Sequence, residues 1–295
     1  MELYEHPNFR SLLSSQNPDG GWSYTRGGSW TEPTCYALLA LSAAGQSASE
    51  EGQRAARWLA ARQRADGGWA PRDVVPESTW VTSLLLLLPD GVISREQAHR
   101  AVAWILSQSG RESSFLFRLR VRLLGATPPP EQEFEGWPWY PNTAGWVGPT
   151  SLSILALRKL VPFGDVQIAA EVDRRVEQGR RYLLARRCRD GGWNHGSSKA
   201  LGYDSDSYPE TTGMALLAMH DSQAPEVVVA QTLAKQQIET CRSCEAASWL
   251  RLALLARGFQ PTSLVLPDPR NTLELAMERI TEAAGRGRNV FIQRT

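Results

Sequence analysis

Two kinds of apolar segment alternate along the chain. In the first kind every helical face is apolar, which predicts helices buried on all sides. These segments fall near 33–44, 79–88, 113–125, 149–160, 210–220 and 244–257. In the second kind only one helical face is apolar, which predicts half-exposed helices. They fall near 3–15, 50–63, 95–108, 171–187, 225–239 and 271–285. The alternation predicts an all-α fold with two concentric layers, and six helices of each kind suit a closed ring of helical hairpins.

An internal repeat supports this organisation. A Gly-Gly-Trp or Gly-Trp element is followed, 12 to 19 residues later, by a Thr that opens an apolar segment. The pairs are Trp22 with Thr34, Trp69 with Thr82, Trp137 with Thr150 and Trp193 with Thr212. Because only glycine enters the left-handed region cheaply, Gly-Gly after an amphipathic segment predicts the end of a helix. The repeat spaces the helices regularly along the chain.

The alternation fails once, over residues 126–148. This stretch holds Pro128-Pro129-Pro130 and the run Trp137-Pro138-Trp139-Tyr140-Pro141 and contains no convincing outer helix. We interpret it as a long loop at one mouth of the ring, a place where function tends to lie. The whole chain, 1–295, is then a single domain, and 262–295 forms a closing helix and tail.

Composition excludes several classes of function. The 295 residues carry a net charge of +1, which argues against nucleic acid as the main partner. No apolar stretch approaches the length of about 20 residues that a membrane-spanning helix needs. The N-terminus lacks the basic and apolar regions of a signal peptide, and four cysteines make no disulfide framework, so we expect a cytoplasmic protein. The chain has 11 Trp residues against 7 Phe and 7 Tyr. We expect a structural or chemical role to explain this excess of a large side chain.

The repeat resembles the one shared by squalene and terpene cyclases and by protein prenyltransferase β subunits. The resemblance covers roughly residues 10–260 and implies an (α/α)6 toroid whose inner helices begin at a central cavity. It also implies an isoprenoid or other hydrophobic small molecule as partner, with peripheral membrane contact rather than a transmembrane segment. The repeat is specific for the fold and not for the reaction.

Class II terpene cyclases carry an Asp-x-Asp-Asp-Thr motif in which the middle Asp donates a proton. Aligned on the repeat Thr, Glu210 and Glu32 occupy that position, and Asp204 or Asp206 supplies a second carboxylate upstream of Glu210. A dry cavity raises the pKa of a carboxyl group, and a neighbouring group tunes it, so such a pair suits a proton donor. The structural alternative is that an acid at a helix start simply suits the helix dipole.

Prenyltransferase β subunits instead bind a catalytic Zn²⁺. Pro33-Thr34-Cys35-Tyr36 resembles their His-Thr-Cys-Tyr, but Pro33 replaces the metal-binding His and no Asp-x-Cys occurs. Cys241 and Cys244 form the only Cys-x-x-Cys, and no second pair follows, so we interpret them as two thiols at a turn. We expect no metal or other cofactor; Mg²⁺ is called for only if the substrate carries a diphosphate.

Aromatic and basic side chains are the remaining candidates for substrate contact. Aromatic rings around the mouth can stabilise a carbocation or hold an apolar chain, or can plug the ring as core. The rim candidates are Trp30, Trp80, Trp139, Tyr140, Trp146 and Tyr208. Arg118, Arg122 and Arg251 interrupt segments of the buried kind, and a buried arginine needs an anionic partner, either a diphosphate or a glutamate.

Four hypotheses follow. The first is an isoprenoid cyclase or isomerase that uses Glu210 or Glu32 as its acid without a metal. The second is a non-catalytic scaffold that binds a ligand or a partner protein. The third is a metal-independent transferase acting on an isoprenyl diphosphate, which depends on inward-facing arginines. The fourth is a polysaccharide-active toroid, against which the missing signal sequence counts. The sequence leaves the oligomeric state open.

Overall fold

The computed structural model describes residues 7–113, 119, 123, 133–159, 166–196, 199–200, 203–260 and 266–293. In this part of the chain the protein is all-α, as expected. The only strands there are β1 (Lys199–Ala200) and β2 (Tyr203–Asp204), which pair antiparallel. The helices are α1 (Pro7–Ser14), α2 (Thr31–Ala43), α3 (Glu50–Ala60), α4 (Val81–Leu87), α5 (Arg95–Ser107), α7 (Val147–Lys159), α8 (Val166–Ala185), α9 (Pro209–Ala218), α10 (Pro225–Thr240), α11 (Cys244–Ala256) and α12 (Thr272–Gly285).

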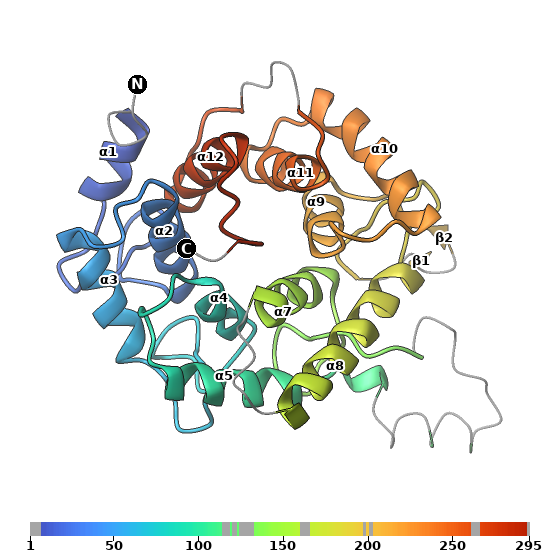
Figure 1. Ribbon diagram of the computed structural model, residues 1–295, viewed down its shortest axis with the longest axis horizontal. Coiled ribbons are helices and arrows are strands. Elements are labelled where there is room, and N and C mark those ends of the chain that lie inside the picture. The colour runs from blue at the N-terminus through green and yellow to red at the C-terminus, as the bar shows by residue number, and fades with distance from the viewer. Residues whose placement is uncertain are drawn as a thin grey trace.

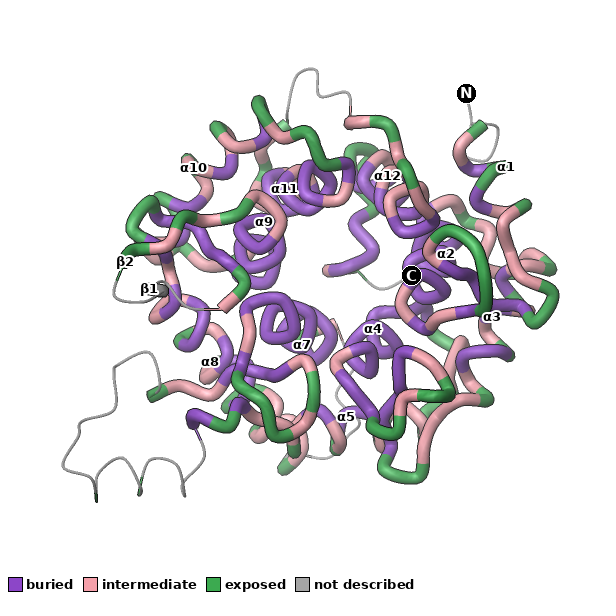
Figure 2. The backbone as a smooth tube through the Cα atoms, turned by 180° about the vertical axis from the view of Figure 1, so that it is seen from behind, coloured by how far each residue is buried: buried purple, intermediate pink, exposed green. Residues whose placement is uncertain are grey.

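Six helices form an inner ring. Helix α2 packs on α4, α4 on α7, α7 on α9, α9 on α11, α11 on α12, and α12 returns to α2 (Figure 1). Apart from α12, the ring helices are apolar on nearly every face, as their sequences predict. Twelve of the thirteen residues of α2 are buried, and all seven of α4. Figure 2 shows these helices almost entirely in the colour of buried residues.

The outer helices cover the ring from outside. Helix α1 packs on α12, α3 on α2, α5 on α4, α8 on α7, and α10 on both α9 and α11. Their sequences place apolar residues on one face, and Ser49 and Ser94 cap the starts of α3 and α5. Ser94 caps α5 in a capping box with Gln97, which satisfies backbone N–H groups that the first turn leaves unpaired.

The repeat joins each outer helix to the next inner helix. The indole N–H of each repeat Trp donates to a carbonyl of an outer helix: Leu12, Leu59, Ile105 or Leu183, at 2.7–2.8 Å. The backbone N–H of the same Trp donates to the hydroxyl of the repeat Thr at the start of the inner helix, for example Trp22 to Thr34 at 2.8 Å. The turn requires glycine because Gly20 has a φ of 98°, in the left-handed region that other residues rarely adopt. Gly67 and Gly191 hold the same position in their repeats, with φ angles of 94° and 97°.

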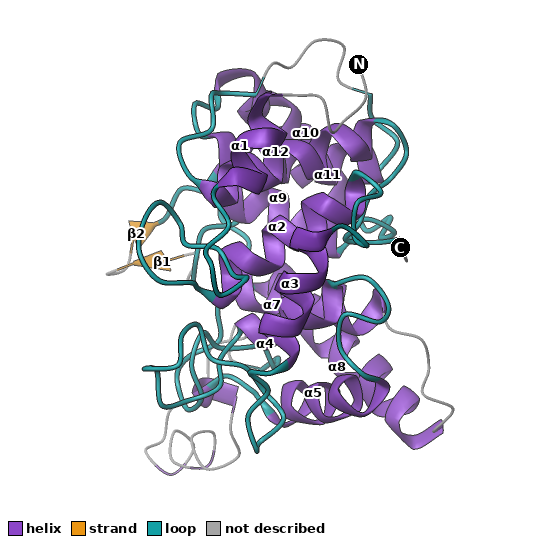
Figure 3. Cartoon of the chain, turned by 90° about the vertical axis from the view of Figure 1, so that its left-hand side faces the viewer, coloured by secondary structure: helices purple, strands orange, loops and turns teal. Residues whose placement is uncertain are grey.

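The starts of the ring helices lie at one end of the molecule. Backbone hydrogen bonds join the loops before them in succession: Thr31 donates to Pro71, Trp80 to Trp139, and Val147 to His195. We call this end the mouth. Figure 3 shows long loops and the β1–β2 hairpin on one side, and the C-terminal residues on the other.

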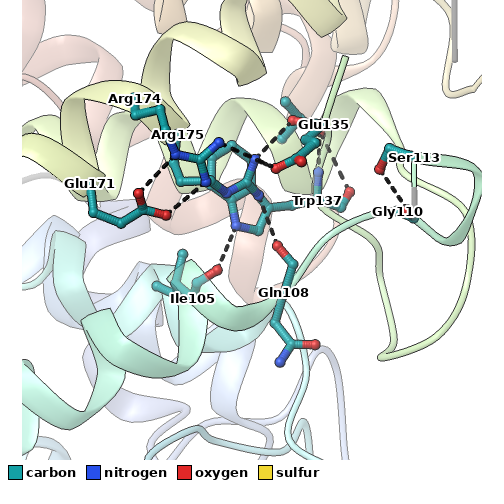
Figure 4. Close-up of polar contacts among 10 residues, drawn as sticks. Ile105, Gln108, Gly110, Ser113, Glu135, Trp137, Glu171, Arg174 and Arg175 are labelled. Carbon is teal, nitrogen blue, oxygen red and sulfur yellow. Dashed lines mark hydrogen bonds and ion pairs between the residues drawn. The ribbon is translucent and has the colours of Figure 1, made fainter. Parts of the chain in front are cut away.

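Buried arginines anchor the loop that precedes α7. Arg175 of α8 is 1% exposed. It donates to the Glu135 carboxylate at 3.0 Å and to the Gln108 carbonyl at 2.8 Å, and its guanidinium stacks on Trp137 at 4.1 Å (Figure 4). Burial lowers the pKa of Arg175 to about 10, so the guanidinium remains charged at neutral pH. A second pair, Arg186 with Glu112 at 3.0 Å, is buried nearby.

The structure corrects one helix assignment. Residues 271–285 were expected in the outer layer, but α12 lies in the ring between α11 and α2. The expectation was wrong because Arg279, which gives α12 its amphipathic pattern, is 4% exposed and paired with Glu278 and Glu282. In the expected inner segment 113–125, the described Leu119 and Leu123 are exposed, at 41% and 78%. Arg118 and Arg122 lie outside the described residues.

Candidate functional site at the mouth of the ring

Three glutamates at the mouth are close enough for the charges of two of them to act on the third. Glu32, Glu210 and Glu245 are each the second residue of a ring helix, α2, α9 and α11 respectively. A carboxylate suits this position because the unpaired N–H groups and the helix dipole make the first turn electropositive. Glu32 is the only residue of α2 that is not fully buried, so the otherwise apolar helix presents a single acid to the mouth.

Burial and mutual repulsion favour the protonated forms of these acids. Burial raises the pKa of Glu245 to about 8, and the charges of Glu210 and Glu32 add to the effect. Burial also raises the pKa of Glu32 to about 7, and Glu210 contributes in the same direction. Burial raises the pKa of Glu210, and the nearby His195 opposes part of this rise. At neutral pH the cluster therefore holds at least one proton.

Tyr24 distinguishes Glu32 from the other two acids. The Tyr24 hydroxyl donates a hydrogen bond to the Glu32 carboxylate, and this bond opposes the rise in the pKa of Glu32. Burial and the nearby negative charges of Glu32 and Glu245 raise the pKa of Tyr24, so the phenol stays protonated and able to donate. The Tyr24 ring packs edge-on against Trp30 at 5.6 Å, and its carbonyl accepts from Thr272 of α12 at 2.8 Å.

A cavity of about 410 Å³ opens beside Glu210. It lies between the start of α9, the end of α10 and the start of α11, and its lining includes Tyr208, Glu210, Cys241 and Ser243. His195 also lines it, and its ring lies 5.2 Å from that of Tyr208 at a tilt of 31°. Glu210 is the member of the cluster that lines this cavity.

The structure brings part of the expected aromatic rim together. Trp80 and Trp139 pack edge to face at 4.8 Å, and Trp139 covers Gly148 of α7 so closely that a side chain there would meet the indole at 3.2 Å. Trp30 lies beneath the guanidinium of Arg72 at 4.8 Å. These indoles are half-buried, as is Trp146, whereas Tyr140 and Tyr208 are 43% and 52% exposed.

Other predicted site residues lie away from the cluster. Asp204 is carried outward on β2 and lies 3.8 Å from Arg189, and Asp206 is exposed in the following turn. The acids near Glu210 come instead from neighbouring helices, because the hairpin turns the upstream chain away from the start of α9. Arg251 lies in the second half of α11 near Gly285 and Glu282 of α12, and so does not join the glutamates.

The cysteines take structural positions. All four are unpaired, and Cys35 and Cys244 are buried. Burial, with the nearby charges of Glu274 and Glu278, raises the pKa of Cys244 to about 12, so this thiol is not an activated nucleophile. Across the described ranges, no three His, Cys, Asp or Glu side chains converge as metal ligands would.

Glu245 was missed in the sequence because α11 lacks the repeat. No Gly-Gly-Trp element precedes it, and Ala247 stands where the other helices have Thr. The signal that could have found it is the helix start itself. Ser243 caps α11 by accepting from the Ala246 N–H, and an acid follows two residues after the cap, as Glu32 follows Trp30 and Glu210 follows Tyr208.

Comparison with known proteins bears on the fold alone. No protein-family model matches the chain. No curated protein matches it either. Among solved structures, the crystal structure of a protein from Actinoplanes is similar, with a TM-score of 0.54 and 17% sequence identity over 92% of this chain and 77% of that chain. Within the described residues, no helix has both the length and the apolar character to cross a bilayer.

Proposed function

We propose that this protein is an isoprenoid cyclase or isomerase that starts its reaction by donating a proton from the glutamate cluster at the mouth of an (α/α)6 toroid. The repeat that resembles that of squalene and terpene cyclases supports the proposal. The order of ring contacts, from α2 through α12 and back to α2, supports the toroid.

The observation that carries the proposal is that Glu32, Glu210 and Glu245, at the starts of three ring helices, are close enough for their charges to act on one another. An ordinary glutamate is ionised at pH 7 and has no proton to give. Because burial raises the pKa of Glu245 to about 8, its carboxyl is largely protonated at neutral pH. The Tyr24 hydrogen bond favours the ionised form of Glu32. With a pKa of about 7, Glu32 is partly ionised at neutral pH, so the three glutamates together offer both a protonated and an ionised carboxyl group.

The proposed chemistry is a net isomerisation. The carboxyl of Glu245 transfers its proton to one carbon of a substrate double bond, which leaves a tertiary carbocation on the other carbon. The π electrons of a neighbouring double bond then close a ring, and a carbon next to the new cation loses a proton to the Glu32 carboxylate. One proton enters and one leaves, so no other reactant is needed. Solvent in the cavity beside Glu210 then restores the original protonation of the two acids.

The aromatic rim suits the cationic intermediate. The face of an indole attracts a cation with about 0.5–2 kcal/mol, more where water is excluded. Trp30 lies against Tyr24 directly beside Glu32, and Tyr208 immediately precedes α9 and lines the cavity next to Glu210. Trp80 and Trp139 extend the apolar surface along the starts of α4 and α7.

The test is product analysis after incubation with farnesyl and geranylgeranyl diphosphates and with the corresponding alcohols. The variants are Glu32→Gln, Glu210→Gln and Glu245→Gln, which keep shape and remove the titrating group. Glu226→Gln is the matched control, because Glu226 follows a proline as the second residue of the outer helix α10, just as Glu210 does in α9. We expect Glu245→Gln and Glu32→Gln to lose at least about a hundredfold in rate and the control to lose none. Turnover of no prenyl substrate, or full activity in all three cluster variants, refutes the proposal.

A second candidate is a non-catalytic scaffold. It is favoured by the packing beneath the mouth, where Tyr36, Trp249 and Phe291 are 2%, 1% and 0% exposed. A scaffold of this kind binds a ligand in the mouth and leaves it unchanged. Binding of an isoprenoid with no product, unaffected by the three glutamine substitutions, identifies this alternative.

A further inference from the structure

We infer that the cavity beside Glu210 is a binding site for a small zwitterion of the amino-acid class, which carries an ammonium group and a carboxylate on one molecule. The ammonium group lies against Glu210 and the carboxylate lies against Arg242. This inference goes beyond the proposed function and does not depend on it, because it concerns binding in the cavity and involves no prenyl substrate.

Three packed helices build the walls of this cavity. Helix α9 packs on both α10 and α11, and α10 packs on α11 (Figure 1). The cavity opens between the start of α9 and the turn 241–243, which joins α10 to α11. Ser243 fixes this turn by accepting a hydrogen bond from the Ala246 N–H at 3.3 Å. The cavity therefore belongs to the folded framework, and its volume of about 410 Å³ is typical of small-molecule sites.

Two opposite charges line the cavity without neutralising each other. Glu210 is half-buried at the start of α9, and Arg242 is exposed in the turn 241–243. Across the part of the chain that the structure describes, neither side chain forms an ion pair or a hydrogen bond. Arg242 is also not among the groups that shift the pKa of Glu210, so its guanidinium lies too far away to act on that carboxyl group. Both charges are thus available to a ligand that reaches from one to the other.

A ligand with a single charge suits this cavity poorly. An anion bound by Arg242 shares the cavity with the Glu210 carboxylate, which repels it, and a cation bound by Glu210 meets the same difficulty with Arg242. A neutral ligand such as a sugar removes both charges from water and pairs neither. A zwitterion pairs both at once, and hydrogen bonds between charged partners are the strong ones.

The surroundings of Glu210 suit an ammonium group. Burial raises the pKa of Glu210, which means that the fold penalises its negative charge. An ammonium group beside the carboxylate offsets this penalty, because an opposite charge favours the ionised form. The Tyr208 ring, 52% exposed, adds an aromatic surface that attracts a cation. Pro209 and Ala246 also line the cavity and give an apolar surface to the rest of the ligand.

The surroundings of Arg242 suit a carboxylate. A guanidinium presents two parallel N–H groups that match the two oxygens of a carboxylate. The Ser243 hydroxyl lines the cavity beside it and accepts from the Ala246 N–H, which leaves its own O–H to donate to the ligand. The turn 241–243 therefore supplies the donors, and the start of α9 supplies the acceptor.

The test measures the binding of L-phenylalanine by isothermal titration calorimetry at pH 8, beside two analogues that each lack one charge. Phenethylamine lacks the carboxylate, and 3-phenylpropionate lacks the ammonium group. We expect the amino acid to bind at least about tenfold more tightly than either analogue, because each charge-assisted hydrogen bond contributes a factor of this size. The other standard L-amino acids are screened by the rise in Tm, and any that binds more tightly is compared with its own amine and acid analogues.

Variants of the two charged residues assign the contacts. Arg242→Gln should weaken the amino acid at least about tenfold without weakening phenethylamine, and Glu210→Gln should weaken the amino acid as much without weakening 3-phenylpropionate. Arg242→Lys keeps the charge and should retain part of the affinity. The matched controls are Glu239→Gln and Arg189→Gln, whose exposed side chains lie outside the cavity lining. They should leave every affinity within about twofold of wild type.

Each outcome decides the matter. The inference is overturned if no amino acid binds, if the amino acid binds no more tightly than its analogues, or if neither cavity variant weakens it. Equal losses in the controls also overturn it, because they show a long-range effect of charge. Amino-acid binding without turnover of any prenyl substrate supports this inference and refutes the proposed reaction, and turnover without amino-acid binding does the reverse.

Discussion

Replacing Glu245 with Gln should stabilise the fold in alkaline solution. The folded state raises the pKa of Glu245 to about 8 from the ordinary value of 4.5. The fold therefore favours the protonated carboxyl, and the stability that this group contributes is fully present below about pH 4.5 and is lost as the pH rises towards 8. Glutamine imitates the protonated acid at every pH, so the variant escapes this loss.

The magnitude follows from the interval between the two pKa values. Each pH unit in that interval is worth about 1.4 kcal/mol, and the interval from 4.5 to about 8 gives about 5 kcal/mol. Glu245 keeps partial contact with solvent and shares its repulsion with Glu32 and Glu210, so about half of this, about 2–3 kcal/mol, should be observed. The variant should match wild type near pH 4.5 and exceed its unfolding free energy by this amount at pH 9.

Urea denaturation at pH 5, 7 and 9, followed by circular dichroism, measures the difference directly. Glu226→Gln serves again as control, because Glu226 has the same place in the first turn of a helix that lies outside the ring. A Glu245→Gln advantage that fails to grow between pH 5 and pH 9 would refute the idea that the mouth penalises the ionised acid. The assay needs no substrate, so it tests the electrostatics independently of the proposed reaction.

Three further predictions follow from single contacts. Tyr24→Phe removes the hydrogen bond to the Glu32 carboxylate, so the pKa of Glu32 should rise further, measured by titration of the side-chain ¹³C signal; an unchanged midpoint contradicts the assignment. Thr34→Val leaves the backbone N–H of Trp22 unpaired in the core and should lower the unfolding free energy by about 1–3 kcal/mol. Thr34→Ser keeps the hydroxyl and should retain most of the wild-type stability. Arg175→Met removes the buried cation that binds the Glu135 carboxylate and the Gln108 carbonyl, and should lower the unfolding free energy by about 2–4 kcal/mol, measured as a lower Tm. A Tm equal to that of wild type would show that the ion pair with Glu135 is dispensable.

The sequence predicts those features whose causes are local. The repeat Trp directly follows the Gly-Gly turn and lies at most 19 residues before the repeat Thr, and the hydrogen bond from Trp193 to Thr212 spans the widest of these gaps. The two layers could be predicted because full burial of α2 requires apolar residues on every face. The same pattern placed Glu32 and Glu210 correctly at helix starts.

What the sequence misses depends on contacts between distant segments. The charges on α12 suggest exposure, and only the pairing of Arg279 with Glu278 and Glu282 permits its burial in the ring. Glu245 joins the cluster because α11 packs between α9 and α12, which no spacing reveals. Asp204 is close to Glu210 in the chain and yet is turned away by the β1–β2 hairpin.

The ring has no covalent closure between α12 and α2. Its seam depends on side-chain packing, with the Thr272 N–H donating to the Tyr24 carbonyl and Asn8 donating to Glu278 across it. A deletion of α12 should therefore open the circle and expose the apolar faces of α2 and α11 together.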